Sequence, residues 1–259
     1  MRIHPEEVIA IVKETRELFL GGADRLQITE KGSCDYVTQI DVQVQSFVTR
    51  RLAERYPQVQ LMGEEKDNSE IDASGDFWIL DPVDGTTNLI HDFQHSTLSL
   101  AYVEDGALTF GVVYHPNSGE VFTAVRGQGA FLNGRPIHVS GAGTLSESLI
   151  SIGTSPYSHE LADRNFAAFK RIFLACQDIR RLGSAAMDMA YVACGRDEAF
   201  FERSLKPWDF AAGRLLVEEA GGTVCDFEGK PVPLTEKADV VATNGKITRE
   251  LLALLGEME

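Results

Sequence analysis

The segment FWILDPVDGTTN, at residues 77–88, is the most informative part of this sequence. Its apolar half, residues 77–80, predicts a short buried strand that ends in Asp81. Pro82 holds the residue before it in an extended conformation, and Asp84 with the glycine after it predicts a sharp turn. The polar residues 86–88 can then cap a new helix. We therefore expect two carboxylates at a strand-to-helix turn.

Carboxylates on such a turn suggest a metal and phosphate site. Asp81 and Asp84 stand three positions apart, so their side chains can converge on one point. Converging carboxylates repel each other unless they are protonated or bound to metal, and oxygen ligands suit Mg²⁺ better than zinc or copper. The free N–H groups at the start of the following helix favour phosphate. A purely structural interpretation, in which both aspartates only cap and turn the backbone, stays open at this point.

Two further acids lie at the ends of other predicted elements. Glu64 follows the strand-like run at residues 59–62. Asp209 opens a helix two residues after Pro207 and, taken alone, is better explained as a partner of the helix dipole than as a ligand. Three separate segments that each deliver a carboxylate favour a shared metal site over the structural interpretations.

The remaining sequence predicts a layered α/β (α+β) architecture. We expect one helix over residues 5–20 and a second helix that begins at Asp41, as its N-cap, and ends near residue 56. Strand signals between residues 97 and 139 alternate with turn signals, which predicts an antiparallel meander.

The pattern changes after about residue 145, where strands and helices alternate. Strands are expected at residues 149–152, 178–182, 198–202, 223–225 and 239–243, and helices at 159–175, 184–194 and 207–220. This alternation predicts helices that cover a sheet. We expect two sub-domains, residues 1–145 with the main metal site and residues 146–259 completing it. They should pack as one rigid body, because no linker separates them.

Composition excludes several classes of function. The 259 residues carry 39 acidic and 24 basic side chains, a net charge of −15, so the long-range field repels nucleic acids and we expect no nucleic-acid partner. Neither a signal peptide nor a membrane span is expected from the sequence. The cysteines, at positions 34, 176, 194 and 225, have no disulfide-like spacing. Free thiols predict a cytoplasmic protein.

Together these segments resemble the inositol monophosphatase family of Mg²⁺-dependent, lithium-sensitive phosphomonoesterases. The resemblance rests on GEE at 63–65, WILDPVDGTTN at 78–88 and KPWDFAAGRLLVEEAGG at 206–222. KGSCDYVTQID at 31–41, GVVYHPNSGEVFTAVRGQGAFLNG at 111–134 and RRLGSAAMDMAYVACG at 180–195 extend it over most of the chain. It implies an αβαβα sandwich with an antiparallel N-terminal sheet and a smaller C-terminal α/β sheet. It also implies a homodimer.

The resemblance implies a set of metal ligands. Glu64, Asp81 and the backbone carbonyl of Val83 would hold one Mg²⁺, and Asp81, Asp84 and Asp209 would hold a second. Glu64 would also share a third, more loosely bound ion, so two or three ions are expected.

It also implies catalytic and substrate-binding residues. Glu64, Asp41 and Thr86 would be catalytic. Thr86, with Asp41 behind it, would orient the attacking water. The N–H groups of Gly85 and Thr86 would bind phosphate, and the metal-site residues Glu64, Val83, Asp84 and Asp209 would also contact the substrate. Positions that match contacts to the substrate alcohol are Gly183, Ser184, Ala185 and Glu202.

These expectations define a reaction. We expect Mg²⁺-dependent hydrolysis of a phosphate monoester, inositol-1-phosphate to inositol and phosphate, by in-line attack of water without a phosphoenzyme. One alternative is a dual or broad-specificity sugar phosphatase with fructose-1,6-bisphosphatase or nucleotide 3′-phosphatase activity. Another is a catalytically idle binding or regulatory protein on the same fold. The pair Arg180-Arg181 would meet a second anionic group or would simply cover a sheet edge.

Overall fold

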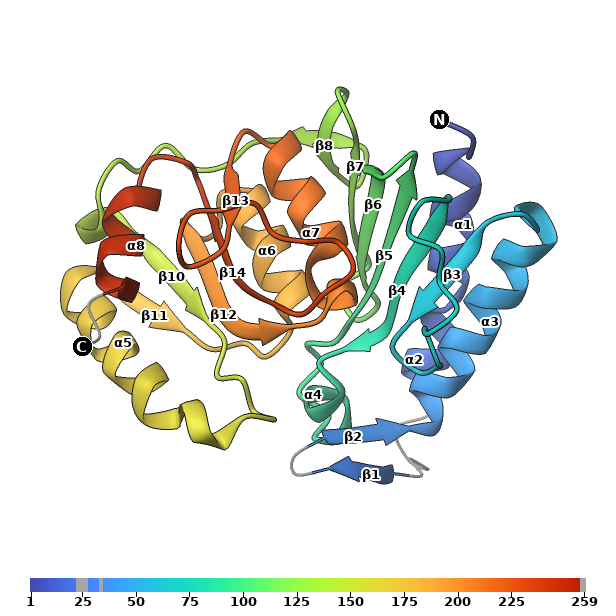
Figure 1. Cartoon of the computed structure of the whole chain (residues 1–259), viewed down its shortest axis with the longest axis horizontal. Helices are drawn as coiled ribbons and strands as arrows, with labels where there is room; N and C mark the ends of the chain where they lie inside the picture. Colours follow the sequence, from blue (N-terminus) through green and yellow to red (C-terminus); the bar gives the residue numbers. More distant parts are fainter. Residues whose placement is uncertain (22–27, 33–34, 257–259) are drawn as a thin grey trace.

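Two β-sheets with helices between and around them give the molecule five layers (Figure 1). The computed structural model describes residues 1–21, 28–32 and 35–256. The first large sheet has the strand order β3-β4-β5-β6-β7-β8-β9, in which β3 is parallel to β4 and the other neighbours are antiparallel. Its strands are β3 (Gln60–Gly63), β4 (Phe77–Asp84), β5 (Thr97–Glu104), β6 (Ala107–His115), β7 (Glu120–Val125), β8 (Gly129–Leu132) and β9 (Arg135–Ile137).

The second sheet is smaller and mixed, with the order β11-β10-β12-β14-β13. β10 is parallel to β11 and β12, whereas β14 is antiparallel to β12 and β13. Its strands are β10 (Leu149–Ile152), β11 (Asp178–Arg180), β12 (Ala199–Leu205), β13 (Thr223–Cys225) and β14 (Ala238–Thr243). The expected αβαβα sandwich is therefore confirmed, with the meander in its larger sheet.

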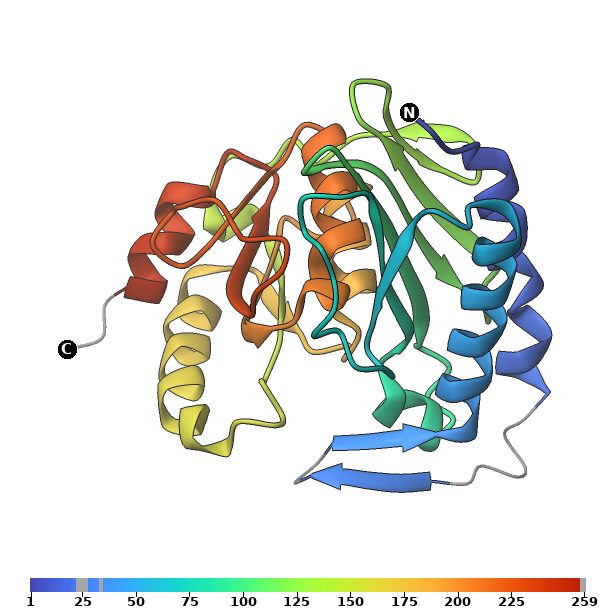
Figure 2. The same ribbon diagram turned by 45° about the vertical axis from the view of Figure 1, so that its right-hand side comes forward.

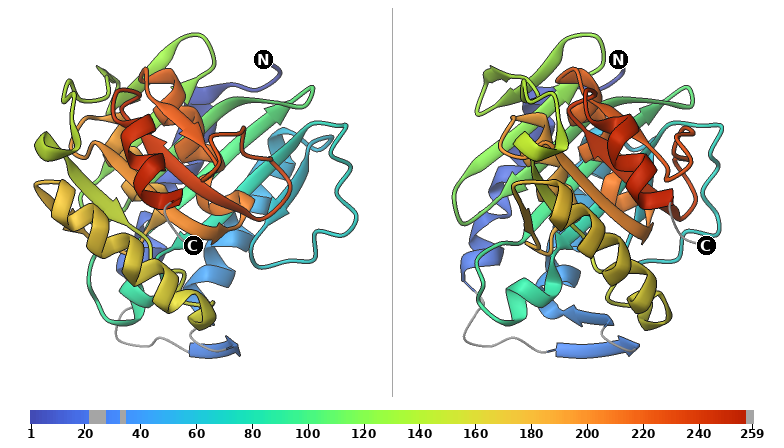
Figure 3. Two further views of the ribbon diagram at one scale, coloured as in Figure 1. Left: turned by 60° about the vertical axis from the view of Figure 1, so that its left-hand side comes forward. Right: turned by 90° about the vertical axis from the view of Figure 1, so that its left-hand side faces the viewer.

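The helices form the other three layers, which Figures 1 and 2 show from two directions. In Figure 1 the first layer packs on the large sheet, the second lies between the sheets, and the third covers the small sheet on the side that faces the viewer in the right-hand view of Figure 3. The first holds α1 (Pro5–Glu14), α2 (Arg16–Leu20) and α3 (Gln39–Arg55). The second holds α6 (Ala185–Ala193) and α7 (Pro207–Glu219). The third holds α5 (Ala162–Ala175) and α8 (Thr248–Gly256).

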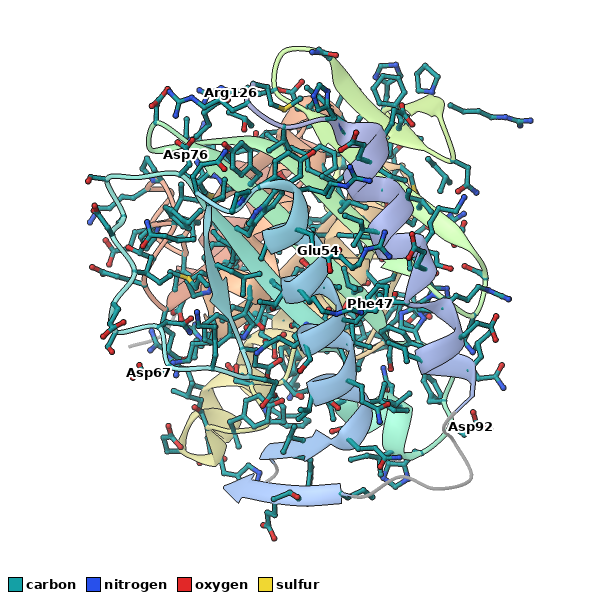
Figure 4. All side chains as sticks on the ribbon, turned by 90° about the vertical axis from the view of Figure 1, so that its right-hand side faces the viewer. Phe47, Glu54, Asp67, Asp76, Asp92 and Arg126 are labelled. Atoms are coloured by element: carbon teal, nitrogen blue, oxygen red, sulfur yellow. The ribbon has the colours of Figure 1, made fainter. Side chains whose placement is uncertain are left out.

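Three apolar clusters hold these layers together. The largest contains Phe122 of the large sheet, Phe210 of α7 and Phe200 of the small sheet, all fully buried. The other two lie under α1 and α3 and under α5 and α8. On the outer face of α3, polar and charged residues such as Glu54 face solvent, while Phe47 is half-buried (Figure 4). Because α6 and α7 pack against both sheets, the division of the chain at residue 145 stays a prediction.

Three helices differ from the sequence-based expectation. Thr38, not Asp41, is the N-cap of α3: its hydroxyl accepts from the Ile40 N–H at 3.1 Å, and Asp41 Oδ2 accepts from the Thr38 N–H at 2.9 Å. The expected helix over residues 5–20 is interrupted at Thr15, whose hydroxyl donates to a carbonyl of the preceding turn. The short helix α4 (Thr86–Ile90) begins at Gly85, with φ = 89°, and has no side-chain cap.

Two elements were not expected from the sequence. A separate two-stranded sheet joins β1 (Ile28–Gly32) and β2 (Asp35–Thr38), and it lies beside α3 and α4 in Figure 1. The C-terminal helix α8 was also missed. The three cysteines that the structure describes are free thiols, and Cys34 lies outside the described residues. No helix within the described ranges is long and apolar enough to cross a membrane.

Candidate active site

A cavity of about 320 Å³ brings together acids from three separate segments. Most of the residues predicted for the site line it: Glu64, Asp81, Val83, Asp84, Gly85, Thr86, Glu202 and Asp209. Four predicted residues do not line it: Asp41, Gly183, Ser184 and Ala185. The cavity therefore gathers the expected carboxylates, and the structure gives some of the other residues a different position.

A bulge in β4 brings the two aspartates of the DPVD motif into the same cavity. Residues three apart on a regular strand face opposite sides of the sheet. Here Asp81 pairs with Ser99 and Asp84 pairs with Thr97, so β4 holds one more residue than β5 over this interval. Pro82 has no N–H to give to the ladder, which favours the irregularity at this point. The extra residue places the side chain of Asp84 on the same face of the sheet as that of Asp81, and both carboxylates line the cavity.

Asp84 is held from behind by the start of α6. Its Oδ2 accepts a hydrogen bond from the Ser184 hydroxyl at 2.6 Å and another from the Ala186 N–H at 2.7 Å. Ser184 is buried, and its hydroxyl also lies 3.1 Å from Thr97 Oγ1. The structure thus uses Ser184 to orient a carboxylate. Contact of Gly183, Ser184 and Ala185 with a substrate alcohol stays a prediction.

Asp209 combines the two roles that the sequence left open. One oxygen, Oδ2, accepts from the Lys206 N–H at 2.7 Å and so caps the start of α7. The residue also lines the cavity with the other acids. A single carboxylate can cap the helix with one oxygen and bind a metal ion with the other, since its two oxygens carry separate lone pairs.

The acids of the cavity destabilise one another's charged forms. Burial raises the pKa of Asp81 well above its usual range, and the charges of Glu64, Asp84 and Asp209 raise it further. Burial and the charges of Asp84 and Glu64 likewise raise the pKa of Asp209. Burial raises the pKa of Asp84 to about 6, although its hydrogen bonds from the start of α6 oppose the rise. A divalent cation among these side chains would remove this penalty.

The donor set fits Mg²⁺ better than a metal that needs a complete protein cage. Asp81 Oδ1 accepts from the Val83 N–H at 3.0 Å, and Asp84 and Asp209 each have one oxygen engaged by backbone N–H groups. Among the described residues, no three His, Cys, Asp or Glu side chains are placed to hold a metal by themselves. Mg²⁺ commonly uses one or two carboxylates, several waters and the phosphate of its substrate. The oxygen donors around this cavity match that mode of binding.

Thr86 and Asp41 form the expected pair. The Thr86 hydroxyl lies 2.9 Å from Asp41 Oδ1 and 3.1 Å from the Val83 carbonyl oxygen. Asp41 is fully buried, and its other oxygen accepts from the Thr38 N–H and hydroxyl. Burial raises the pKa of Asp41, while these hydrogen bonds lower it. A Thr86 hydroxyl that donates to Asp41 keeps its lone pairs available to accept a hydrogen bond from the cavity.

Glu202 is positioned by a close approach of two strands. Its Oε1 accepts from the Ser155 N–H at 2.8 Å, and burial raises its pKa to about 7. The neighbouring strand end carries Gly153, where a Cβ atom would overlap the Glu202 carboxyl group. The absence of a side chain at Gly153 therefore makes room for this carboxylate.

Sequence reasoning missed much of the remaining cavity lining. Its polar members come from the loop after β10 and from the segments before α7 and β14: Ser155, Tyr157, Ser158, Ser204, Lys206 and Lys237. No motif marks loop residues of this kind. Arg180 pairs with Asp178, and Arg181 donates to Thr154 Oγ1 at 3.0 Å, so neither arginine lines the cavity.

Comparison with known proteins places the chain in a family. A family model described as "Inositol monophosphatase family" matches residues 5–258. The chain is 40% identical over 230 residues to Nus factor SuhB of Escherichia coli K12, which covers 89% of this chain and 86% of the relative. The fold matches the crystal structure of extragenic suppressor protein suhB from Bartonella henselae with a TM-score of 0.92 and 32% identity, over 98% of each chain.

A second solved structure bears on the metal. It is an IMPase/NADP phosphatase complexed with Mg²⁺ and phosphate, with a TM-score of 0.89 and 27% identity over 98% of this chain and 95% of that chain. The expectation that nucleic acids are excluded as partners gains no support, because the Escherichia coli relative is called a Nus factor. The match over nearly the whole chain shows that this protein belongs to the inositol monophosphatase family.

Proposed function

We propose that the chain is a Mg²⁺-dependent phosphatase that hydrolyses small phosphorylated polyols or sugars, with inositol-1-phosphate as its simplest substrate. The observation that carries the proposal is the bulge in β4, which brings Asp81 and Asp84 into one cavity with Glu64 and Asp209. A purely structural turn would not need to align a buried and a half-buried carboxylate in one cavity, where burial and mutual repulsion disfavour their charged forms. The Mg²⁺ and phosphate in the related phosphatase support the same function.

The chain's own residues suit this chemistry. Glu64, Asp81, Asp84, Asp209 and the Val83 carbonyl would hold two or three Mg²⁺ ions. Bound Mg²⁺ supplies an activated water and neutralises charge on the phosphoryl group. The acids that repel each other in the free protein are thus used to attract an anionic substrate to a chain with a net charge of −15.

The phosphate and the attacking water are oriented by the start of α4. We propose that the Gly85 and Thr86 N–H groups bind phosphate oxygens, since they lie at the beginning of this helix and line the cavity. The Thr86 hydroxyl donates to Asp41 and accepts from the water that attacks phosphorus. Because Asp41 and the Val83 carbonyl fix the position of the Thr86 hydroxyl, Thr86 would hold the attacking water in a defined orientation.

Glu202 completes the site on the side of the small sheet. It lines the same cavity as the metal-site acids but is separate from them in the sequence, on β12. As a carboxylate it accepts hydrogen bonds from hydroxyl groups, which a polyol or sugar substrate supplies. We therefore assign Glu202 to recognition of the alcohol part of the substrate.

A phosphate-release panel tests the proposal. The purified protein is given inositol-1-phosphate, fructose-1,6-bisphosphate, adenosine 3′,5′-bisphosphate and NADP, each with Mg²⁺, with EDTA and with added Li⁺. We expect release in Mg²⁺ and none in EDTA, and inhibition by Li⁺ as the family resemblance implies. Absence of release from every ester at saturating Mg²⁺ would contradict the proposal.

A binding role separate from hydrolysis is the second candidate. The observation that favours it is the name of the Escherichia coli relative, Nus factor SuhB, which describes no hydrolase. The two candidates are distinguished by the Asp84→Asn variant, which we expect to lose phosphate release. A binding role that needs no turnover would survive this substitution.

A homodimer, as the resemblance implies, is testable by light scattering.

A further inference from the structure

Two lysines in the lining of the active-site cavity have no assigned role. Lys206 precedes α7, and Lys237 precedes β14, so two distant segments bring a positive charge to the same cavity. Both side chains are exposed, and within the described ranges neither forms an ion pair. A third cation of the lining, Arg203, is already occupied, because it pairs with Asp239 at 2.9 Å and stacks over Phe227.

The backbone around these lysines is built in an unusual way. β12 carries a bulge between Glu202 and Leu205, and Ser204 within it has φ = 65°. Ser155, on the facing loop, has φ = 50°, and its hydroxyl donates to the Arg203 carbonyl at 2.9 Å. Residues other than glycine adopt this left-handed conformation at an energetic cost and persist there where the surroundings enforce it. Bulges of this kind are common beside active sites, where they redirect the chain.

Positive charge continues beyond the active-site cavity. A second cavity of about 490 Å³ shares Arg203 and Lys237 with the first and is also lined by Arg164. Burial lowers the pKa of the Arg203 guanidinium, and the nearby charge of Arg164 lowers it further. Like charges placed together in a chain of net charge −15 suggest an anionic ligand.

The acids of the second cavity each have other hydrogen-bond or ion-pair partners than Arg164 and Lys237. Asp226 accepts from the Glu228 and Lys230 N–H groups at 2.9 and 2.8 Å, and Glu228 pairs with the Lys230 ammonium. Asp239 pairs with Arg203 and accepts from the Ser204 N–H at 2.9 Å. The positive charges without a carboxylate partner among the described residues are therefore those at the border of the two cavities, Arg164, Lys206 and Lys237.

We propose that Lys206 and Lys237 form a subsite for a second phosphate group, so that the preferred substrates are phosphate monoesters that carry another phosphate away from the scissile one. This inference rests on the proposed function, since the scissile phosphate lies at the carboxylate end of the same cavity. An ammonium on a flexible stem binds phosphate as a point charge and adapts to its position. The subsite therefore selects for the second charge and tolerates different sugar or nucleoside parts.

A subsite that is remote from the reacting phosphorus has a defined kinetic signature. It binds the second phosphate equally well in the ground state and in the transition state, so its loss raises KM and changes kcat little. A phosphate–ammonium hydrogen bond is charge-assisted, and loss of both lysines is expected to raise KM about tenfold. For a substrate without the second phosphate, loss of the two lysines is expected to leave KM unchanged.

The test compares two substrates that differ only in the second phosphate. Fructose-1,6-bisphosphate and fructose-1-phosphate are hydrolysed by the wild type, by Lys206→Gln, by Lys237→Gln and by the double variant at saturating Mg²⁺. Lys13→Gln, an exposed lysine on α1, is the matched control. We expect the ratio of kcat/KM for bisphosphate over monophosphate to fall about tenfold in the double variant and to stay at the wild-type value in the control. An unchanged ratio in the double variant would overturn the subsite.

A second measurement separates this inference from the proposed function. If the wild type releases phosphate from neither fructose ester, the subsite is tested by calorimetric titration in EDTA, and the phosphatase proposal itself fails only if inositol-1-phosphate and the other esters of the panel are not hydrolysed either. There, fructose-1,6-bisphosphate must bind the wild type more tightly than it binds the double variant. Equal binding to both proteins would refute the subsite independently of catalysis.

Discussion

Replacing Asp84 by asparagine is expected to abolish phosphate release and, at the same time, to stabilise the metal-free protein. The Asn oxygen can keep the hydrogen bonds from the Ser184 hydroxyl and the Ala186 N–H, so the local geometry survives. The side chain loses its charge, which in the wild type raises the pKa values of both Asp81 and Asp209. A group that the active protein needs is thus a source of instability when no metal is bound.

The size of the effect follows from the pKa of Asp84, which burial raises from 3.8 to about 6. This rise corresponds to about 3 kcal/mol of lost stability at neutral pH. Asp84 is only half-buried, so solvent screens its charge. The expected gain in the free energy of unfolding of the variant is therefore reduced to about 1–2 kcal/mol. For a chain of 259 residues, a gain of that size raises Tm by roughly 2–4 °C.

The pH dependence has a definite sign. Below the unfolded value of 3.8, Asp84 is protonated in the folded and unfolded chain alike, so its ionisation costs the wild type nothing. As the pH rises from 3.8 to about 6, the unfolded chain releases this proton first, and the wild type loses stability relative to the variant. The full difference is reached above about pH 6.

The assay is thermal unfolding of both proteins in EDTA between pH 4 and pH 8, repeated with Mg²⁺, alongside phosphate release from inositol-1-phosphate. We expect the variant to have the higher Tm at pH 7 in EDTA and Mg²⁺ to stabilise the wild type more than the variant. A variant less stable than the wild type at pH 7 in EDTA would refute the electrostatic argument. A variant that keeps wild-type turnover would refute the assignment of Asp84.

Three further predictions concern other parts of the site. Thr86→Ala is expected to lower kcat about 100-fold with little change in Tm, because Thr86 orients the water. Thr87→Ala, at the exposed neighbouring position, serves as the control. A kcat of Thr86→Ala equal to that of the wild type would show that Thr86 takes no part in the reaction. Gly153→Ala should displace the Glu202 carboxyl and raise KM for polyol substrates about tenfold, and an unchanged KM would contradict the role of Glu202. Because burial raises the pKa of Glu202 to about 7, KM should fall as the pH rises through 7 in the wild type, and Glu202→Gln should remove that dependence.

Much of the fold follows from local signals in the sequence. The meander could be predicted because each turn between its strands carries glycine with a polar neighbour, as at residues 105–106 and 133–134. The strands and helices after residue 145 were also predicted in the right order. The hairpin of β1 and β2 and the helix α8 lacked comparable signals, and α8 is held mainly by its contacts with α5 and the small sheet.

The site was predictable in its residue types but not in its geometry. The motif around Asp81 and Asp84 marks both carboxylates, yet only the register with β5 reveals the bulge that lets them face one cavity. Ser184 lies 100 residues from its partner Asp84, so no local pattern indicates that it holds this carboxylate. Lys206 and Lys237 were missed for the same reason, because packing of distant segments alone brings them into the cavity.

The central claim is that the carboxylates of this cavity exist to bind Mg²⁺ for hydrolysis of a phosphate monoester. The most direct measurement is the initial rate of phosphate release from inositol-1-phosphate by the wild type as Mg²⁺ is titrated into the metal-free protein. We predict no release in EDTA and a saturable rise in rate with Mg²⁺. Release that is equal in EDTA and in Mg²⁺, or no release at any Mg²⁺ concentration, would contradict the claim.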